Sequence, residues 1–105
     1  MEAALRAIAE PRRRRILQLV WDRELSAGAI ASQFEVSRPA ISQHLSVLKE
    51  AGLVNERRNG TQRLYTARPQ GLAELKAFLD RFWDERLEAL QQEAERKEQK
   101  HGKRN

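Results

Sequence analysis

Residues 37–52 read SRPAISQHLSVLKEAG, and they contain the start, the periodicity and the end of one helix. Ser37 is a residue type whose side chain caps a helix N-terminus, and Pro39 fits the first turn, where its missing N–H costs nothing. Gly52 supplies the left-handed residue that commonly ends a helix. The stretch therefore predicts a helix that begins after Ser37 and ends before Gly52.

The two sides of this helix differ in kind. At 100° per residue, Ile41, Leu45 and Leu48 fall on one side, which we expect to be buried. The opposite side carries small polar groups instead of long charged pairs: Pro39, Ser42, Gln43 and Ser46, with Arg38 and Lys49 flanking them. Serine can hydrogen-bond to several bases and glutamine can bond bidentately to adenine, so this side suits the floor of a DNA major groove. Free N–H groups at the Ser37 end suit a phosphate.

His44 lies at the edge of the apolar side of this helix. One interpretation is that it packs at the seam of the domain, and the other is that it hydrogen-bonds to a phosphate or a base edge. The sequence leaves both open, so His44 is included among the DNA-binding candidates. It is a poor metal ligand, because no second histidine or carboxylate stands near it at ligand spacing.

The pattern changes to alternating runs in residues 53–67, LVNERRNGTQRLYTA. Asn59–Gly60 between such runs is a strong hairpin signal, because both residues of the turn need a positive φ. We expect the tip and its basic flanks to contact phosphate or the minor groove, with Arg58 and Arg63 as first choices. The candidates are Arg57, Arg58, Asn59, Gly60, Thr61 and Arg63.

Three helices are expected upstream of residue 37. They cover residues 3–9, a segment from Pro11 to about Asp22, and a short segment after the N-cap Ser26. The second has an apolar stripe that ends at Trp21, and its first turn holds Arg12 to Arg15. We expect most of these arginines to form a solvated face, with Arg13 and Arg14 able to pair with acids inside the domain. The alternative is that some of them bind phosphate. The whole order predicts a mostly α fold with a small β-hairpin, a winged helix-turn-helix of about five helices and a two-stranded wing.

The last element is a long amphipathic helix that starts after Pro69 and Gly71. Its large apolar side chains recur at spacings of three and four, and they exceed what one small domain can cover. We expect residues 1–95 to form the DNA-binding domain with its terminal helices. Residues 96–105 lack apolar side chains and are expected to be a disordered basic tail.

Composition narrows the class of protein. Lys plus Arg total 20 against 15 Asp plus Glu, a net charge of +5 that favours an anionic partner such as double-stranded DNA. The absence of cysteine excludes disulfides, thiolate metal sites and cysteine nucleophiles. No apolar run is long enough to insert into a membrane and the N-terminus is not a signal peptide, so we expect a cytoplasmic protein. No catalytic set or cofactor motif is present, and Ser42 and His44 point about 200° apart on their helix.

The segments EPRRRRILQLV, LSAGAIASQFEVSRPAISQHLSVLKEAGLV and RRNGTQRLY together resemble the ArsR family of bacterial winged-helix repressors. The resemblance covers about residues 3–94 and is closest to the metal-independent autorepressor (SdpR-like) branch. It implies a dimeric repressor that reads a palindromic operator, with the first and last helices packed against a second copy. The residues expected at this interface are apolar: Leu5, Ile8, Leu75, Leu79, Phe82, Trp83, Leu87 and Leu90.

The chain departs from the metal-sensing members of that family, since it has no cysteine and its last helix offers Asp80, Asp84 and Glu88 without a histidine. We therefore expect no metal site. Two other functions stay open: a non-specific architectural DNA-binding protein, and an interaction module that uses the long helix. An effector, either a regulatory protein or a ligand, cannot be identified from the sequence.

Overall fold

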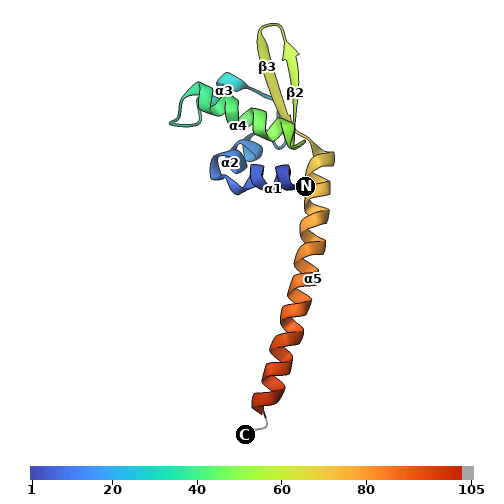
Figure 1. The fold of residues 1–105 in the computed structure, drawn as a ribbon. Helices are drawn as coiled ribbons and strands as arrows, with labels where there is room; N and C mark the ends of the chain where they lie inside the picture. The colour runs from blue at the N-terminus through green and yellow to red at the C-terminus, as the bar shows by residue number, and fades with distance from the viewer. Residues whose placement is uncertain (103–105) are drawn as a thin grey trace. The chain divides into compact units, whose positions relative to one another are not determined.

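The structure is a computed structural model that describes residues 1–102, and the side chains of residues 1–97. Its elements in chain order are α1 (Glu2–Ala9), α2 (Pro11–Leu19), β1 (Leu25–Ser26), α3 (Ala27–Ala31), α4 (Arg38–Glu50), β2 (Val54–Asn59), β3 (Gln62–Ala67) and α5 (Pro69–Gly102) (Figure 1). This order confirms the predicted winged helix-turn-helix. The sheet has one strand more than predicted, because β1 pairs with β3, and the antiparallel strands lie in the order β1-β3-β2.

The chain divides into two compact units, residues 1–75 and residues 76–105. The first unit holds α1 to α4, the sheet and the start of α5. The second holds the rest of α5, which is helical up to Gly102. The boundary predicted after residue 95 falls inside this helix, and residues 103–105 of the predicted tail lie outside the described residues.

The core of the first unit is closed around α4, which contacts α1, α2, α3 and β2. Ile41, Leu45 and Leu48 have 0% of their surface exposed, as their predicted inward side requires. The large fully buried side chains around α4 are Ile16, Val20, Ile30 and Leu53. Burying one such side chain stabilises the fold by roughly 1.5–3 kcal/mol, so the three inward positions of α4 fix which of its sides faces out.

Helix α2 is shorter than its apolar stripe predicts. It ends at Leu19, and the carbonyl of Val20 accepts a hydrogen bond from the backbone N–H of Ala67 at the end of β3 (2.9 Å). The chain therefore leaves the helix to meet the sheet before it reaches Trp21, whose side chain is 60% exposed. The prediction that Trp21 belongs to the buried stripe is wrong for this reason.

The ends of α4 follow the predicted signals. The Ser37 hydroxyl accepts a hydrogen bond from the backbone N–H of Ala40 (3.3 Å), and Gly52 adopts a φ of 76° just beyond the helix. The start of α5 packs against this end, and a Cβ at the buried Gly71 would overlap the carbonyl oxygen of Gly52. Only glycine at position 71 allows the two backbones to approach this closely.

The tip of the wing is a two-residue turn, but it is shifted by one position from the prediction. The strand register pairs Asn59 with Gln62, so the turn residues are Gly60 and Thr61. Only Gly60 has a positive φ (65°), and Asn59 belongs to β2. One positive φ at the first turn position is the pattern of a type II′ turn, whereas Asn59–Gly60 would have required two.

Candidate nucleic-acid interface

The outward side of α4 presents the predicted compact polar group. Ser42, Gln43 and Ser46 are exposed, directly opposite the buried apolar residues. One shallow depression runs along this side, lined by Ser37, Pro39, Ala40, Ser42, Gln43 and Ser46. Five of these six residues are predicted candidates, so the fold brings them together on one surface.

A groove connects α4 to the wing. Ser42 and Ser46 line one wall of a groove of about 520 Å³, and Arg38 also borders it. Thr61 and Arg63 of the wing line it from the other side. The remaining lining residues come from the start of α3 and from the sheet: Ser26, Ala27, Gly28, Gln62 and Tyr65. The recognition side of α4 and the wing are thus one continuous surface rather than two separate ones.

Arg57 of the wing is held by an acid. Its Nε and Nη2 atoms donate to the two carboxylate oxygens of Glu24 at 3.1 and 2.6 Å. This bidentate pair lowers the pKa of Glu24 through the hydrogen bonds and raises the pKa of Arg57. The guanidinium of Arg57 is therefore already engaged, which makes it a weaker phosphate-binding candidate than its neighbours.

Glu56 precedes Arg57 on β2 and points to the opposite face of the wing, where it has three partners. It accepts a hydrogen bond from the buried Tyr65 hydroxyl at 2.8 Å, lies 3.3 Å from the Lys49 ammonium, and approaches Arg63 at 4.0 Å. The hydrogen bond from Tyr65 lowers the pKa of Glu56 despite partial burial, and Lys49 and Arg63 add to the effect. Burial and the bond to Glu56 raise the pKa of Tyr65. The Glu56 carboxylate therefore attracts both Lys49 and Arg63 and restricts where their side chains lie.

Arg58 stands apart from these pairs. It lies directly across the hairpin from Arg63, and it is exposed. Within residues 1–97, Arg58 makes no ion pair with a carboxylate. Two like charges opposite each other destabilise a hairpin, and an external anion would relieve that repulsion. Among the wing arginines, Arg58 is the one whose guanidinium no described carboxylate engages.

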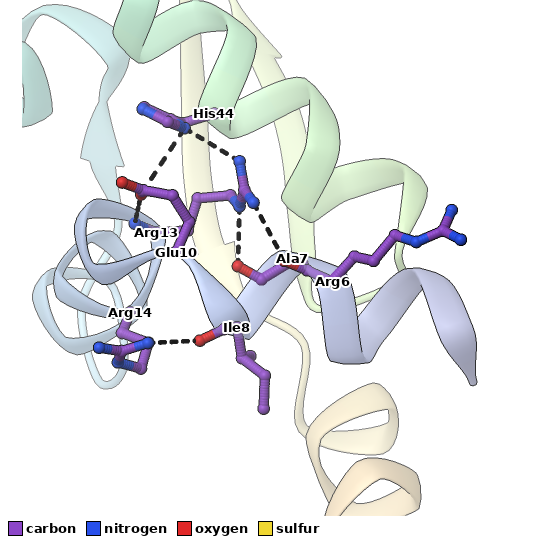
Figure 2. A network of polar contacts seen from close by, with 7 residues as sticks. All are labelled: Arg6, Ala7, Ile8, Glu10, Arg13, Arg14 and His44. Atoms are coloured by element: carbon purple, nitrogen blue, oxygen red, sulfur yellow. Dashed lines mark hydrogen bonds and ion pairs between the residues drawn. The ribbon is translucent and has the colours of Figure 1, made fainter.

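His44 turns away from the reading side of α4, into a network with α1 and α2 (Figure 2). Its side chain is 18% exposed, and its Nδ1 atom lies 3.3 Å from Arg13 Nη1 and 4.0 Å from Glu10 Oε2. Of the two interpretations that the sequence leaves open for His44, this geometry favours packing at the domain seam over direct contact with DNA.

Two of the first-turn arginines of α2, Arg13 and Arg14, form hydrogen bonds inside the domain. Arg13 donates from Nε to the carbonyl of Ala7 (2.7 Å) and from Nη2 to that of Arg6 (3.0 Å), while Arg14 donates to Ile8 (2.7 Å) (Figure 2). These are carbonyls at the C-terminal end of α1, which otherwise lack partners. The guanidinium groups thus cap the preceding helix, whereas the sequence indicates acidic side chains as their partners.

Glu10 is the N-cap of α2, and its carboxylate accepts from the backbone N–H of Arg13 at 3.0 Å. Burial would raise the pKa of Glu10, but this hydrogen bond, the protonated form of His44, the backbone N–H of Arg12 and the charge of Arg13 bring it below its ordinary value. Sequence reasoning missed Glu10, although an acid directly before Pro11 is a local capping signal. Glu24, Glu56 and Tyr65 were also missed, because their partners are set by the tertiary fold.

The apolar candidates for a dimer interface divide into two groups. Leu75 is only 5% exposed and packs within its own unit, so its assignment to a partner-facing surface is not supported. Leu5, Ile8 and Leu79 are half-buried. The exposed group lies on α5 and has large apolar side chains: Phe82 (43%), Trp83 (61%), Leu87 (46%) and Leu90 (62%).

The described part of the chain contains no cluster of three or more histidine or carboxylate side chains arranged to hold a metal ion. Among its helices, none has the length and apolar character needed to span a membrane.

A capped helix with a compact polar outer side, a basic hairpin and a groove joining them define a winged helix-turn-helix DNA-binding protein. Residues 10–56 match the model of the bacterial regulatory protein, arsR family. The chain is 46% identical over 86 residues to the HTH-type transcriptional regulator Rv2034 of Mycobacterium tuberculosis, covering 82% of this chain and 80% of that protein. It therefore belongs to the ArsR family of transcriptional regulators.

Other relatives have named regulatory roles. The transcriptional repressor SdpR of Bacillus subtilis is 42% identical over 60 residues, which are 57% of this chain and 67% of SdpR. The transcriptional activator HlyU of Vibrio cholerae is 41% identical over 76 residues, which are 72% of this chain and 68% of HlyU.

Two solved structures extend the comparison. A possible transcriptional regulator for arsenical resistance is 51% identical, with a TM-score of 0.73 over 77% of this chain and 84% of that one. The homodimeric winged helix-turn-helix DNA-binding domain of Mb0332 from Mycobacterium bovis is 33% identical, with a TM-score of 0.64 over 80% and 78%.

Proposed function

We propose that this ArsR-family regulator is a sequence-specific repressor that binds a palindromic DNA site as a homodimer in the bacterial cytoplasm. The observation that carries the proposal is the outward side of α4. Ser42, Gln43 and Ser46 are exposed and form no side-chain hydrogen bonds within residues 1–97, while the opposite side of the helix is fully buried. A rigid helix with uncommitted donors and acceptors is what direct reading of base edges requires.

The wing supplies the sequence-independent part of binding. Arg58 has no acidic partner among the described side chains, and Arg63 is 54% exposed and only loosely held by Glu56 at 4.0 Å. We assign phosphate or minor-groove contact to these two arginines. Such contacts fix the position of the protein on the duplex, and the residues of α4 supply the discrimination between sequences.

The homodimer rests on the exposed apolar residues of α5. Phe82, Trp83, Leu87 and Leu90 are each more than 40% exposed in a single chain, which a soluble monomer would expose to water at a cost. The relative from M. bovis is homodimeric by its description. A two-fold dimer presents two copies of α4 and therefore reads two inverted half-sites about one helical turn apart.

Selection of bound sequences from random duplex DNA tests specificity, symmetry and half-site spacing together. We expect an inverted repeat with a half-site spacing of about 10 base pairs. Recovery of unrelated sequences at moderate salt would instead identify a non-specific architectural binder. A promoter–reporter assay with the selected site then gives the sign of regulation, since the relatives include both a repressor and an activator.

Gln43→Ala tests the role of α4 against the matched variant Gln18→Ala, which changes an exposed glutamine of α2. We expect Gln43→Ala to lose about 1–3 kcal/mol of discrimination between the selected and a scrambled duplex. Gln18→Ala should keep it. Solution mass at micromolar concentration completes the test, because a monomer would favour the alternative of an interaction module.

A further inference from the structure

His44 occupies an unusual place for a residue of a DNA-reading helix. It directly follows Gln43, yet its ring is mostly buried between α4 and the junction of α1 with α2 (Figure 2). The ring meets two groups of opposite charge, the Arg13 guanidinium at 3.3 Å and the Glu10 carboxylate at 4.0 Å. Both contacts use the same nitrogen, Nδ1.

The chemistry of these partners assigns the protonation state of that nitrogen. Arginine has donors and no acceptor, so Arg13 Nη1 can hydrogen-bond to Nδ1 only when Nδ1 presents its lone pair. A proton on Nδ1 removes the lone pair and sets two cations against each other. The same proton creates a donor for Glu10, which is 4.0 Å away. Protonation therefore exchanges the partner of His44 from Arg13 to Glu10.

Arg13 transmits this exchange to α1. The same guanidinium donates to the carbonyls of Ala7 and Arg6, so one side chain joins the end of α1 to the helix that carries Gln43. We propose that His44 is a proton-sensitive positioning residue: neutral, it links α4 to the end of α1 through Arg13, and protonated, it turns to Glu10, gives up the link to α1 and weakens DNA binding. This inference rests on the proposed function of α4 as the DNA-reading helix.

Within residues 1–97, Arg13 and Glu10 are the charged side chains in contact with the ring. On α1, Arg6 extends away from His44, and on α2, Arg14 is bound to the carbonyl of Ile8 (Figure 2). Helix α3 has no titratable residue. On β2, Glu56 is paired with Lys49, which lies on α4 itself. Glu10 and Arg13 are therefore the two groups that decide how His44 responds to a proton.

The sign of the pH effect separates this role from direct DNA contact. A histidine that bonds to phosphate gains charge as pH falls and strengthens binding. A histidine that must accept from Arg13 loses its link as pH falls and weakens binding. Since one hydrogen bond contributes modestly, we expect the Kd for the selected duplex to rise about three- to tenfold between pH 8 and pH 6 at constant salt.

The experiment compares wild type, His44→Asn and Gln18→Ala, using the selected duplex and fluorescence anisotropy at both pH values. Asparagine places an oxygen acceptor near the position of Nδ1 and does not titrate, so its Kd should change less than twofold between the two pH values. Gln18→Ala should keep the wild-type response. Stronger wild-type binding at pH 6, or an equal response of wild type and His44→Asn, overturns the proposal.

A measurement on the unaltered protein guards against misfolding of the variant and against failure of the proposed function. The ¹⁵N NMR signals of the His44 imidazole should show, at pH 8 and without DNA, an unprotonated Nδ1 and a proton on Nε2. A proton on Nδ1 at that pH overturns the proposal. If wild type binds no duplex specifically, the proposed function fails, while this spectrum still decides whether His44 accepts from Arg13.

Discussion

The outward side of α4 and the wing differ in whether their polar side chains already have partners within the protein. On α4, three fully buried residues hold the helix from within, and the outer serines and glutamine are left without side-chain partners. On the wing, Arg57 and Arg63 face carboxylates of the same chain, whereas Arg58 faces none among the described side chains. A basic residue in the sequence is therefore not always available to bind DNA, because a carboxylate of the same chain can already be paired with it. The contrast supports the proposal that α4 discriminates between sequences while the wing makes a small number of phosphate contacts.

The largest effect should come from removing the inner support of α4. Leu45→Ala deletes a side chain with 0% exposure and should lower the free energy of unfolding by about 2–5 kcal/mol in urea denaturation. Ser46→Ala, on the outer side of the same helix, should change it by less than about 0.5 kcal/mol. Equal losses in the two variants would contradict the assignment of inner and outer sides.

A smaller effect should distinguish two adjacent arginines of the wing. Arg58→Ala should reduce the slope of log K against log salt by about 0.9, the value for one lost phosphate contact. Arg57→Ala should leave the slope nearly unchanged, since its guanidinium is held by Glu24. Titrations at four salt concentrations measure both slopes. If both variants lose the same amount, the bridge to Glu24 does not withhold Arg57 from DNA.

Releasing Arg57 should have the opposite sign. Glu24→Gln removes the negative charge that engages Arg57, so the guanidinium becomes free to approach a phosphate. We expect non-specific binding to tighten and the salt slope to steepen by less than about 0.9. The double variant Glu24→Gln/Arg57→Ala is the control and should return to the original slope. An unchanged slope in Glu24→Gln would show that Arg57 cannot reach the duplex.

The smallest effect concerns acid. The pKa of Glu56 is lowered by the hydrogen bond from Tyr65, so its charged form is favoured in the folded state. Its contribution to stability is present above the ordinary value of about 4.5 and is lost as pH falls through the lower folded pKa. Wild type should therefore lose more Tm than Glu56→Gln between pH 6 and pH 3. The same loss in both proteins would exclude Glu56 as a source of acid sensitivity.

The parts of the fold that the sequence predicted are local ones. The cap at Ser37, the stop at Gly52 and the inward side of α4 depend on residues within one helix, so periodicity and capping rules were sufficient. The turn of the wing was misplaced by one residue because strand register, rather than the Asn59–Gly60 pair, decides which residues form the turn. The length of α2 was overestimated for a similar reason, since β3 draws Val20 out of the helix.

The polar contacts of the site could not be predicted in the same way. Glu24 and Arg57 are 33 residues apart, and Arg13 and His44 are 31 apart. Side chains so distant in sequence meet only after the helices and the sheet have packed, and no spacing rule describes them. For this reason the sequence identified which residues have the chemistry to bind DNA, but not which of them the protein already uses for itself.

The contact between Gly71 and the Gly52 carbonyl is a place where a single substitution would change how two elements pack. It joins the end of the DNA-reading helix to the start of α5, and a side chain at position 71 would act as a wedge between them. Alanine at this position already places its Cβ against the Gly52 carbonyl oxygen, so the two backbones have to separate although no DNA-facing residue changes. Position 71 therefore sets how closely the end of α4 and the start of α5 can approach.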